Sequence, residues 1–285
     1  MDHENTGFAP YEDCSDLLAN RSALDEFYNT NGYVFLRGVL DPAKVELVAT
    51  QMLDGLRQLG HVPDGATLEN TGLKSYEAVD EAALHEYVNY DEFWNDPSTV
   101  RVLEQVFGEP ISVFKSTTIR YYPGGTNPDG PNYVTPLHQD GYYIGPNKDF
   151  RTTWVPLLPT SSTVGGVALA PGSHTEGARD HVRDERYERF GRAVSGIPAD
   201  SLENFYPFRF SSMEPGDVLI FHAFLCHKSV PNLDRTGKIR MSMDTRVQPE
   251  ATPFGYNAAT PWVESSKDAS KGIMSKLTGT STVEA

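Results

Sequence analysis

Short apolar segments separated by turns dominate the sequence from residue 111 onward, and they restrict the folds that this chain can adopt. Each segment is rich in β-branched and aromatic residues, and prolines and glycines stand between neighbouring segments. This pattern is typical of an antiparallel sheet built from many short strands. The expected strands are residues 111–122, 152–158, 166–170, 217–225 and 239–247.

The N-terminal part of the chain instead contains the start and stop signals of helices. Asp41-Pro42 and Asp96-Pro97 each combine a good N-cap residue with a proline at the first helical position. Gly60 and Gly108 follow the two apolar-periodic stretches as stop signals. Helices followed by many strands predict an α+β fold, with a double-stranded β-helix (jelly roll) as its core and N-terminal helices flanking it. A short helix at 24–28 and a strand at 33–40 are also expected.

The length of 285 residues suits one large domain, and we expect a single domain over residues 1–285. The segments 1–20 and 265–285 are polar and are expected to be peripheral. The loop 123–136 is rich in proline and glycine and should lack regular structure. A helical insertion is expected within 177–205, which carries Arg183, Arg186, Arg189 and Arg192.

Charge and cysteine content restrict the partners and the compartment. The formal net charge of -15 argues against nucleic acid and anionic membranes, because phosphates repel such a surface. The only cysteines are Cys14 and Cys226, so a disulfide framework is not expected and a reducing compartment is favoured. The first residues lack the layout of a signal peptide, and no apolar run is long enough to span a bilayer. We therefore expect a cytoplasmic protein that acts on a small molecule, with no protein partner predicted.

A candidate metal site combines His138-Gln139-Asp140 with His227. If the first segment is extended, the side chains two residues apart project to one face, which in a barrel is the interior. Two imidazoles and one carboxylate are the facial triad of non-heme Fe(II) oxygenases, which leaves coordination positions open. On an extended strand Cys226 and His222 would face away from this site. The alternative is that these histidines are packed core residues.

An oxygenase of this kind needs a two-electron donor, and 2-oxoglutarate can fill two of the open positions. Its distal carboxylate then needs a cation, for which the planar fork of arginine is the best fit. Arg240 lies on the strand after His227 and can point inward. Two alternatives stay open: Arg240 pairs with Asp234 or Asp244, or Arg246 takes this role.

Several segments resemble the phytanoyl-CoA dioxygenase family of Fe(II)/2-oxoglutarate oxygenases. They are His138-Gln139-Asp140, GGVALAPGSH (165–174), Gly216-Asp217, HKSVPN (227–232) and Arg240. Within that family, a nearly full-length resemblance points to hydroxylases of a sesquiterpenoid carboxylic acid from a bacterial antibiotic pathway. It rests on STTIRYYP (116–123), HQDGYYIGPNKDFRTTW (138–154), RMSMDTRVQP (240–249) and ATPWVESSKDASKGIM (259–274).

The resemblance implies a role for each of eight residues. His138, Asp140 and His227 would hold Fe(II). Trp154, Ser229 and Arg240 would contact 2-oxoglutarate, and Arg120 and Arg189 would bind the carboxylate of the terpenoid acid. The reaction would consume O₂, release succinate and CO₂, and be supported by ascorbate.

The residues themselves support part of this assignment. Thr118, Arg120 and Tyr122 share one strand face, so Arg120 can turn inward, where a buried arginine needs an anionic partner. A structural ion pair would serve equally well. From the residues alone, Trp154 is equally a core residue and Arg189 belongs to a solvated helix face.

Asp140 favours hydroxylation, because a halogenase of this type would need its position vacated for chloride. Three alternatives stay open. The first is a family member that acts on another small natural-product acid. The second is a non-oxidative cupin-like enzyme with Zn²⁺ or Mn²⁺, and the third is a non-catalytic jelly roll.

Overall fold

A computed structural model describes residues 7–72, 81–125, 135–144, 149–183, 195–198 and 206–253. Its centre is a six-stranded antiparallel sheet in the order β1-β8-β4-β10-β2, with β3 also paired to β10. The strands are β1 (Tyr33–Leu36), β2 (Ile111–Val113), β3 (Thr118–Tyr122), β4 (Arg151–Pro156), β8 (Val218–His222) and β10 (Arg240–Pro249). A second sheet pairs β5 (Gly166–Leu169) with β9 (His227–Val230), and a third pairs β6 (Val182–Arg183) with β7 (Ser195–Gly196).

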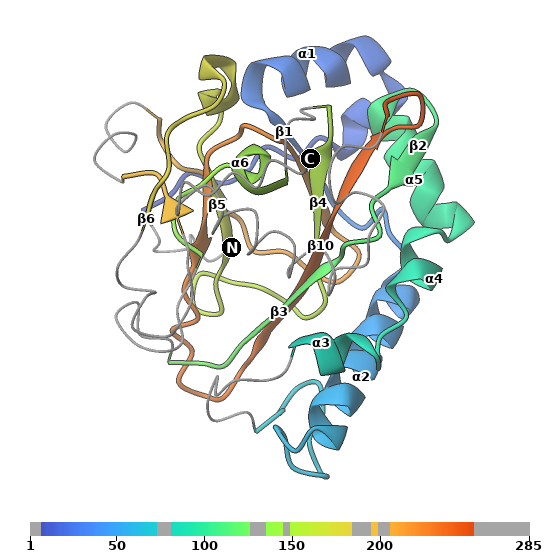
Figure 1. Cartoon of the computed structure of the whole chain (residues 1–285), viewed down its shortest axis with the longest axis vertical. Coiled ribbons are helices and arrows are strands. Elements are labelled where there is room, and N and C mark those ends of the chain that lie inside the picture. Colours follow the sequence, from blue (N-terminus) through green and yellow to red (C-terminus); the bar gives the residue numbers. More distant parts are fainter. Residues whose placement is uncertain are drawn as a thin grey trace, which may run out of the picture.

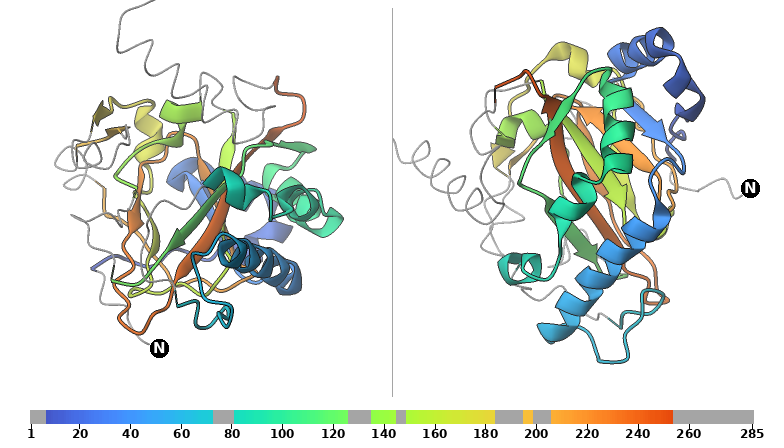
Figure 2. Two further views of the ribbon diagram at one scale, coloured as in Figure 1. Left: turned by 60° about the horizontal axis from the view of Figure 1, so that its bottom comes forward. Right: turned by 90° about the vertical axis from the view of Figure 1, so that its right-hand side faces the viewer.

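Helices cover one face of the large sheet (Figures 1 and 2). They are α1 (Arg21–Asn31), α2 (Pro42–Gln58), α3 (Glu81–His85), α4 (Tyr90–Trp94) and α5 (Pro97–Phe107). Elsewhere lie the 3₁₀ turns η1 (Ser15–Ala19) and η2 (Ser173–Glu176) and the short helix α6 (Asp140–Ile144). Asp41 and Asp96 cap α2 and α5 by accepting a hydrogen bond from the second residue beyond them, and each cap is followed by proline. These start signals were predicted from the sequence. Within the described residues, no helix has the length and apolar character needed to cross a bilayer.

The two faces of the large sheet differ in chemistry. Toward the helices it presents apolar side chains, among them Val34, Ile220, Met241 and Met243. The opposite face meets β5 and β9, and around Tyr33, Phe35 and Leu219 it is also apolar. Along β10, however, the side chains that alternate with the methionines are polar and buried: Arg240, Ser242, Asp244 and Arg246. This arrangement confirms the predicted jelly roll and places a charged stripe inside it.

Three strand boundaries differ from the prediction, each for a local reason. The expected strand 111–122 is two strands, because the hydroxyl of Thr245 binds the carbonyls of Phe114 and Ser116 and bends the segment between them. The expected strand 33–40 ends early, where Gly38 takes a φ of +61° and donates its N–H to Asp217. The strand that begins near 217 ends at His222, whose ring Nδ1 accepts from the N–H of Phe224 and starts a turn.

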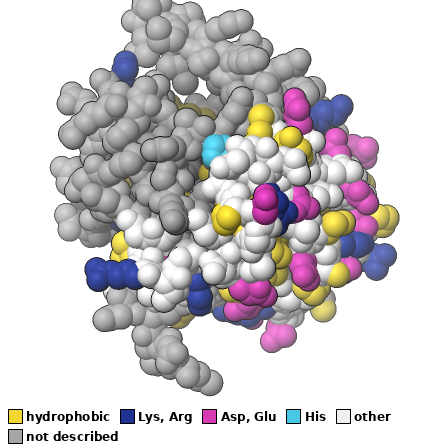
Figure 3. Space-filling model, turned by 90° about the horizontal axis from the view of Figure 1, so that it is seen from below, with side chains coloured by type: hydrophobic (Ala, Val, Ile, Leu, Met, Phe, Trp, Pro, Cys, Tyr) yellow, Lys and Arg dark blue, Asp and Glu magenta, His cyan; other side chains and the backbone are white. Residues whose placement is uncertain are grey.

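The expected helical insertion is wrong where the structure describes it, because Arg183 lies on β6 and pairs with Ser195. Arg186, Arg189, Arg192 and the segment 265–285 lie outside the described residues. Both cysteines are buried and free. On the described part of the face in Figure 3, acidic and basic side chains are interspersed.

Candidate metal centre and pocket

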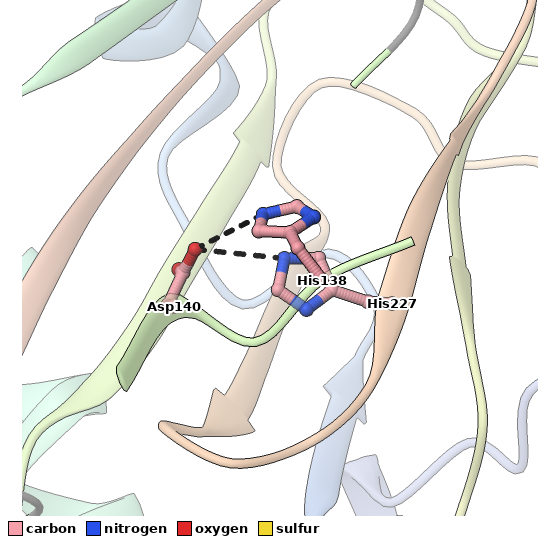
Figure 4. A group of neighbouring side chains, drawn as sticks. All are labelled: His138, Asp140 and His227. Carbon is pink, nitrogen blue, oxygen red and sulfur yellow. Dashed lines mark ion pairs between the residues drawn. The ribbon is translucent and has the colours of Figure 1, made fainter. Parts of the chain in front are cut away.

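His138, Asp140 and His227 meet at one point inside the jelly roll (Figure 4). The backbones of His138 and His227 exchange N–H···O hydrogen bonds of 2.9 and 3.0 Å, which places the two rings side by side with centroids 4.1 Å apart. Asp140 follows at the first position of α6. The Nε2 atoms of His138 and His227 lie 3.3 and 3.7 Å from Oδ1 of Asp140. The three residues are buried.

The route to this geometry differs from the expected extended His-x-Asp segment. Only His138 is strand-like, through its bridge to His227. The chain then turns into α6, because the N–H of Gly141 bonds to the carbonyl of Ala223 and that of Tyr142 to the carbonyl of Gln139. Asp140 therefore reaches the two imidazoles from a helix start.

Backbone carbonyls orient both imidazole rings. Nδ1 of His138 lies 2.8 Å from the carbonyl oxygen of Pro136, and Nδ1 of His227 lies 2.9 Å from that of Leu225. A carbonyl can only accept, so each Nδ1 donates to it, and Nε2 is the nitrogen of each ring that faces Asp140 and can bind a metal. Burial, reinforced by His138, lowers the pKa of His227 to about 3, so this ring is neutral near pH 7. Neutral imidazole is the form that binds metal.

The two carboxylate oxygens of Asp140 have different surroundings. Oδ2 accepts hydrogen bonds from Thr152 Oγ1 and from Nη2 of Arg246, the latter at 2.8 Å. Oδ1 is the atom that faces the imidazoles. Burial, the largest single effect, opposes ionisation of Asp140, but the charge of Arg246 together with the contacts to His138 and His227 outweighs it and holds the pKa of this carboxyl well below its usual range. Asp140 is thus a carboxylate with one oxygen held by the protein and the other turned to the imidazoles.

This donor set fits a divalent metal ion. One atom from each of the three residues lies within 4.8 Å of the other two, as ligands of one ion must. Two imidazole nitrogens and one carboxylate oxygen match the ligands of non-heme Fe(II), and three protein ligands leave positions open for further ligands. The orienting bonds to Nδ1 and to Oδ2 are the supporting contacts that such ligands usually have.

The triad lies in the wall of a pocket with about 330 Å³ of empty space, counted to its open mouth. The other lining residues are Arg120, Thr135, Thr152, Trp154, Val167, Phe221, Lys228, Ser229, Asp244 and Arg246. Three of the residues that the sequence assigned to ligands therefore reach the pocket: Trp154, Ser229 and Arg120.

Trp154 and Ser229 lie in the wall on opposite sheets. Trp154 is buried on β4, and none of the described residues accepts a hydrogen bond from its indole Nε1. Ser229 is on β9, opposite Val167 of β5 and two residues beyond His227. An indole N–H and a serine hydroxyl can both donate to a carboxylate. This placement agrees with the role that the resemblance implies.

Arg240 is buried beside the pocket but is not part of its lining. Its Nη1 donates to the carbonyl oxygens of Gly166 and Val230, and its guanidinium lies 4.1 Å from the ring centre of Tyr122. Arg246, the competitor on the same strand, pairs with Asp140 and Asp244 instead. The two arginines thus have separate tasks: Arg246 supports the metal ligand, and Arg240 binds the backbone of the strand pair β5–β9.

Arg120 has the structural ion pair that the sequence left open. Its Nε donates to Oδ1 of Asp244 at 3.1 Å and its Nη1 to Thr135 at 3.3 Å. The side chain is still 24% exposed and lines the pocket. Arg189, the second residue assigned to the substrate carboxylate, lies outside the described residues.

The sequence analysis missed Thr152, Asp244 and Gln139 as parts of the site. Asp244 could have been predicted, because residues 240, 244 and 246 are an even number of positions apart on β10 and therefore point to the same face of the strand. The amide of Gln139 donates to the carbonyls of Phe224 and Gly177 and accepts from the N–H of Arg179. It thereby connects the His138-Asp140 turn to the turn between β8 and β9, which precedes His227. No sequence pattern indicates this contact, since it depends on two distant turns.

Comparison with known proteins gives consistent relatives. The family described as phytanoyl-CoA dioxygenase matches residues 28–242. The 1-deoxypentalenic acid 11-beta-hydroxylase of Streptomyces arenae is 60% identical over 277 residues, which are 96% of this chain and 98% of the relative. The enzyme of the same name from Streptomyces exfoliatus is 59% identical over 273 residues, covering 95% and 96%. The solved structure of the non-heme monooxygenase ThoJ is 16% identical and superimposes with a TM-score of 0.59. The match covers 90% of this chain and 100% of the ThoJ chain, which supports the fold.

Proposed function

Because the chain belongs to the phytanoyl-CoA dioxygenase family of Fe(II)/2-oxoglutarate oxygenases, we propose that it hydroxylates 1-deoxypentalenic acid at C11 on the β face. The protein is an oxygenase whose cofactors are iron and 2-oxoglutarate. The substrate comes from the two Streptomyces relatives, which share about three residues in five over nearly the whole length. Succinate and CO₂ are the coproducts of 2-oxoglutarate in this reaction.

The main structural support for an Fe(II) oxygenase is that His138, Asp140 and His227 come from two distant segments and meet at one buried point. We propose that these three residues hold Fe(II) through two Nε2 atoms and Oδ1. When bound, iron with 2-oxoglutarate and O₂ supplies the oxidising power that hydroxylation of an unactivated C–H bond needs. The protein supplies the ligand geometry, a carboxylate that stays ionised and, in His227, an imidazole that stays neutral.

The other assigned residues would hold the two carboxylic acids. Trp154 and Ser229 would donate hydrogen bonds to 2-oxoglutarate from opposite walls, and Arg240 would provide the cation for its distal carboxylate. Arg120 and Arg189 would bind the carboxylate of the terpenoid acid and so present one C–H bond to the metal. Apolar wall residues such as Phe221 and Val167 suit a hydrocarbon skeleton and help to exclude water.

The compartment, the domain organisation and the absence of macromolecular partners are proposed as well. The enzyme would act in the cytoplasm as one domain over residues 1–285, without nucleic acid, membrane or protein partner. The unpaired, buried Cys14 and Cys226 agree with a reducing compartment.

The test is turnover of 1-deoxypentalenic acid by the full chain with Fe(II), ascorbate, 2-oxoglutarate and O₂. We expect a product that has gained one oxygen atom, together with one succinate per product, as measured by mass spectrometry. The methyl ester of the acid is the matched control and should react poorly, because it lacks the anion for Arg120. Conversion under argon would exclude the oxygenase. Succinate release without any oxidised acid would leave the class intact and refute the substrate.

A further inference from the structure

We propose that Asp244 is a positioning residue that couples the metal site to the substrate side of the pocket. It stands between two arginines on the inner face of the jelly roll. Its Oδ1 accepts from Nε of Arg120 at 3.1 Å, and its Oδ2 accepts from Nη1 of Arg246 at 2.9 Å. Arg246 in turn donates through Nη2 to Asp140 at 2.8 Å. The four side chains form one line of alternating charge from the pocket wall to the metal ligand.

Each group in this line uses a different atom for each neighbour. Asp140 gives Oδ2 to Arg246 and keeps Oδ1 for the imidazoles. Arg246 uses its two terminal nitrogens for two different carboxylates. The side chains of Asp140, Asp244 and Arg246 are at most 8% exposed, so water contributes little to their charge balance. A change at one end is therefore transmitted to the other by direct contact.

Loss of the negative charge at position 244 has two consequences of opposite sign. Nη1 of Arg246 would lose its anionic acceptor and keep only neutral ones, such as the hydroxyl of Thr118 at 3.4 Å. The carboxylate that Arg246 still contacts is Asp140, whose Oδ1 faces the imidazoles. A guanidinium that competes for Oδ1, with one additional net positive charge nearby, opposes binding of a divalent cation. At the same time Nε of Arg120 is released, so this guanidinium can bind a ligand carboxylate more completely.

The role of Arg120 in this inference rests on the proposed function, whereas the link between Asp244 and the metal site does not. Binding of an anion at Arg120 and of a metal at the triad would be coupled through Asp244, and such coupling is reciprocal. A purely structural Asp244 would behave differently, because its loss would weaken both binding events together.

The experiment compares Asp244→Asn with the unmodified chain. Binding of Co(II) alone is followed by its visible absorption, and binding of 1-deoxypentalenic acid is measured without O₂ at saturating Co(II) and 2-oxoglutarate. We expect the affinity for Co(II) to fall about tenfold, from one added charge in a buried site. We expect the affinity for the acid to rise several-fold, and the affinity for its methyl ester to stay unchanged.

Thr245→Val is the matched control. Thr245 is the next residue on β10, is buried and binds the carbonyls of Phe114 and Ser116, and it is not among the pocket residues. This variant should unfold more easily and yet bind Co(II) and the acid as the unmodified chain does.

Arg120→Gln tests the same chain of ion pairs from the substrate side of the pocket. It replaces Asp244→Asn as the decisive variant if Asp244→Asn does not fold. With Arg120 neutral, Asp244 interacts with Arg246 alone and the region is more negative, so Co(II) should bind more tightly while the acid binds more weakly. Unchanged Co(II) affinity in the foldable variants, or a parallel loss of both affinities in Asp244→Asn, would overturn the proposal. If the unmodified chain binds no 1-deoxypentalenic acid, the proposed substrate is wrong and the Co(II) measurements alone decide the role of Asp244.

Discussion

Hydrogen bonds to the side-chain atoms that face away from the metal site determine which atom of each triad residue can bind the metal. The carbonyls of Pro136 and Leu225 fix which nitrogen of each imidazole is free, and Arg246 fixes which oxygen of Asp140 is free. Gln139 extends this support, since its buried amide ties the metal-binding turn to the carbonyl of Phe224, three residues before His227. Gln139 thus adds a side-chain contact to the backbone hydrogen bonds that join the two halves of the site.

Gln139→Leu is predicted to weaken the metal site more than its effect on folding explains. The variant removes the amide donor from the part-buried carbonyls of Gly177 and Phe224, which costs at most about 1–3 kcal/mol for each group. It also releases the turn before His227, so the affinity for Co(II) should fall about tenfold, as is usual for contacts that support metal ligands. Metal titration and urea unfolding of the metal-free protein measure the two effects.

Gln248→Leu is the control for this prediction. Gln248 is also a buried glutamine, and its Nε2 donates to the carbonyl of Thr252 at the far end of β10. Its replacement should reduce stability only. The coupling role of Gln139 is refuted if both leucine variants keep the Co(II) affinity of the unmodified chain.

At the scale of elements, the small sheet β5–β9 is the part that delivers His227. It is closed at one end by Gly165, whose φ is +82° and whose backbone approaches β9 closely. A Cβ at this glycine would lie 2.3 Å from the carbonyl oxygen of Val230. Only glycine fits here, for conformational and steric reasons together.

Gly165→Ala is therefore predicted to destabilise the fold more than alanine at another left-handed glycine. Gly60 has a similar φ of +78° but nothing within 4 Å of the added carbon. Gly60→Ala should cost about 1–2 kcal/mol in free energy of unfolding, from backbone strain alone. Gly165→Ala adds the clash with β9 and should also lower Co(II) affinity by displacing His227. Equal unfolding free energies of the two variants, in urea titrations, would argue against this view of the β5–β9 pair.

At the scale of the whole molecule, buried neutral histidines make stability depend on pH. Burial, with the help of His174 and Arg151, lowers the pKa of His222 to about 4 from 6.5. Burial likewise lowers the pKa of His85 to about 4. Between these values the unfolded chain binds more protons than the folded one, so stability rises with pH across this window. In His222, protonation also conflicts with the N–H of Phe224, which donates to Nδ1.

The metal-free protein should therefore lose stability as the pH falls from about 6.5 toward 4. Urea unfolding at a series of pH values, in the presence of a chelator, measures this slope. His222→Gln cannot gain a proton and should reduce the slope in this window, whatever its effect near neutral pH. An unchanged slope in the variant would exclude His222 as a source of the acid sensitivity.

Residue chemistry and local helix and strand signals were sufficient to predict much of the fold and the metal-binding residues. Asp-Pro caps mark the starts of α2 and α5 because these signals act within one turn of the chain, and β-branched segments mark the strands. The identity of the triad residues, the jelly roll and the family followed from motifs that a single sequence contains. The α6 turn at Asp140 and the division of 111–122 into two strands did not, since hydrogen bonds from distant residues cause both.

Only the tertiary structure decided how the charged side chains are divided among tasks. By strand alternation alone Arg240 and Arg246 are equivalent, because both point to the same face of one strand with an aspartate between them. In the fold, the pairing of β10 with β3 and β4 brings Arg246 to Asp140 and Asp244, while Arg240 meets β5 and β9. A charge in a buried region takes its role from the groups that surround it in space, and strand register rather than sequence distance selects those groups.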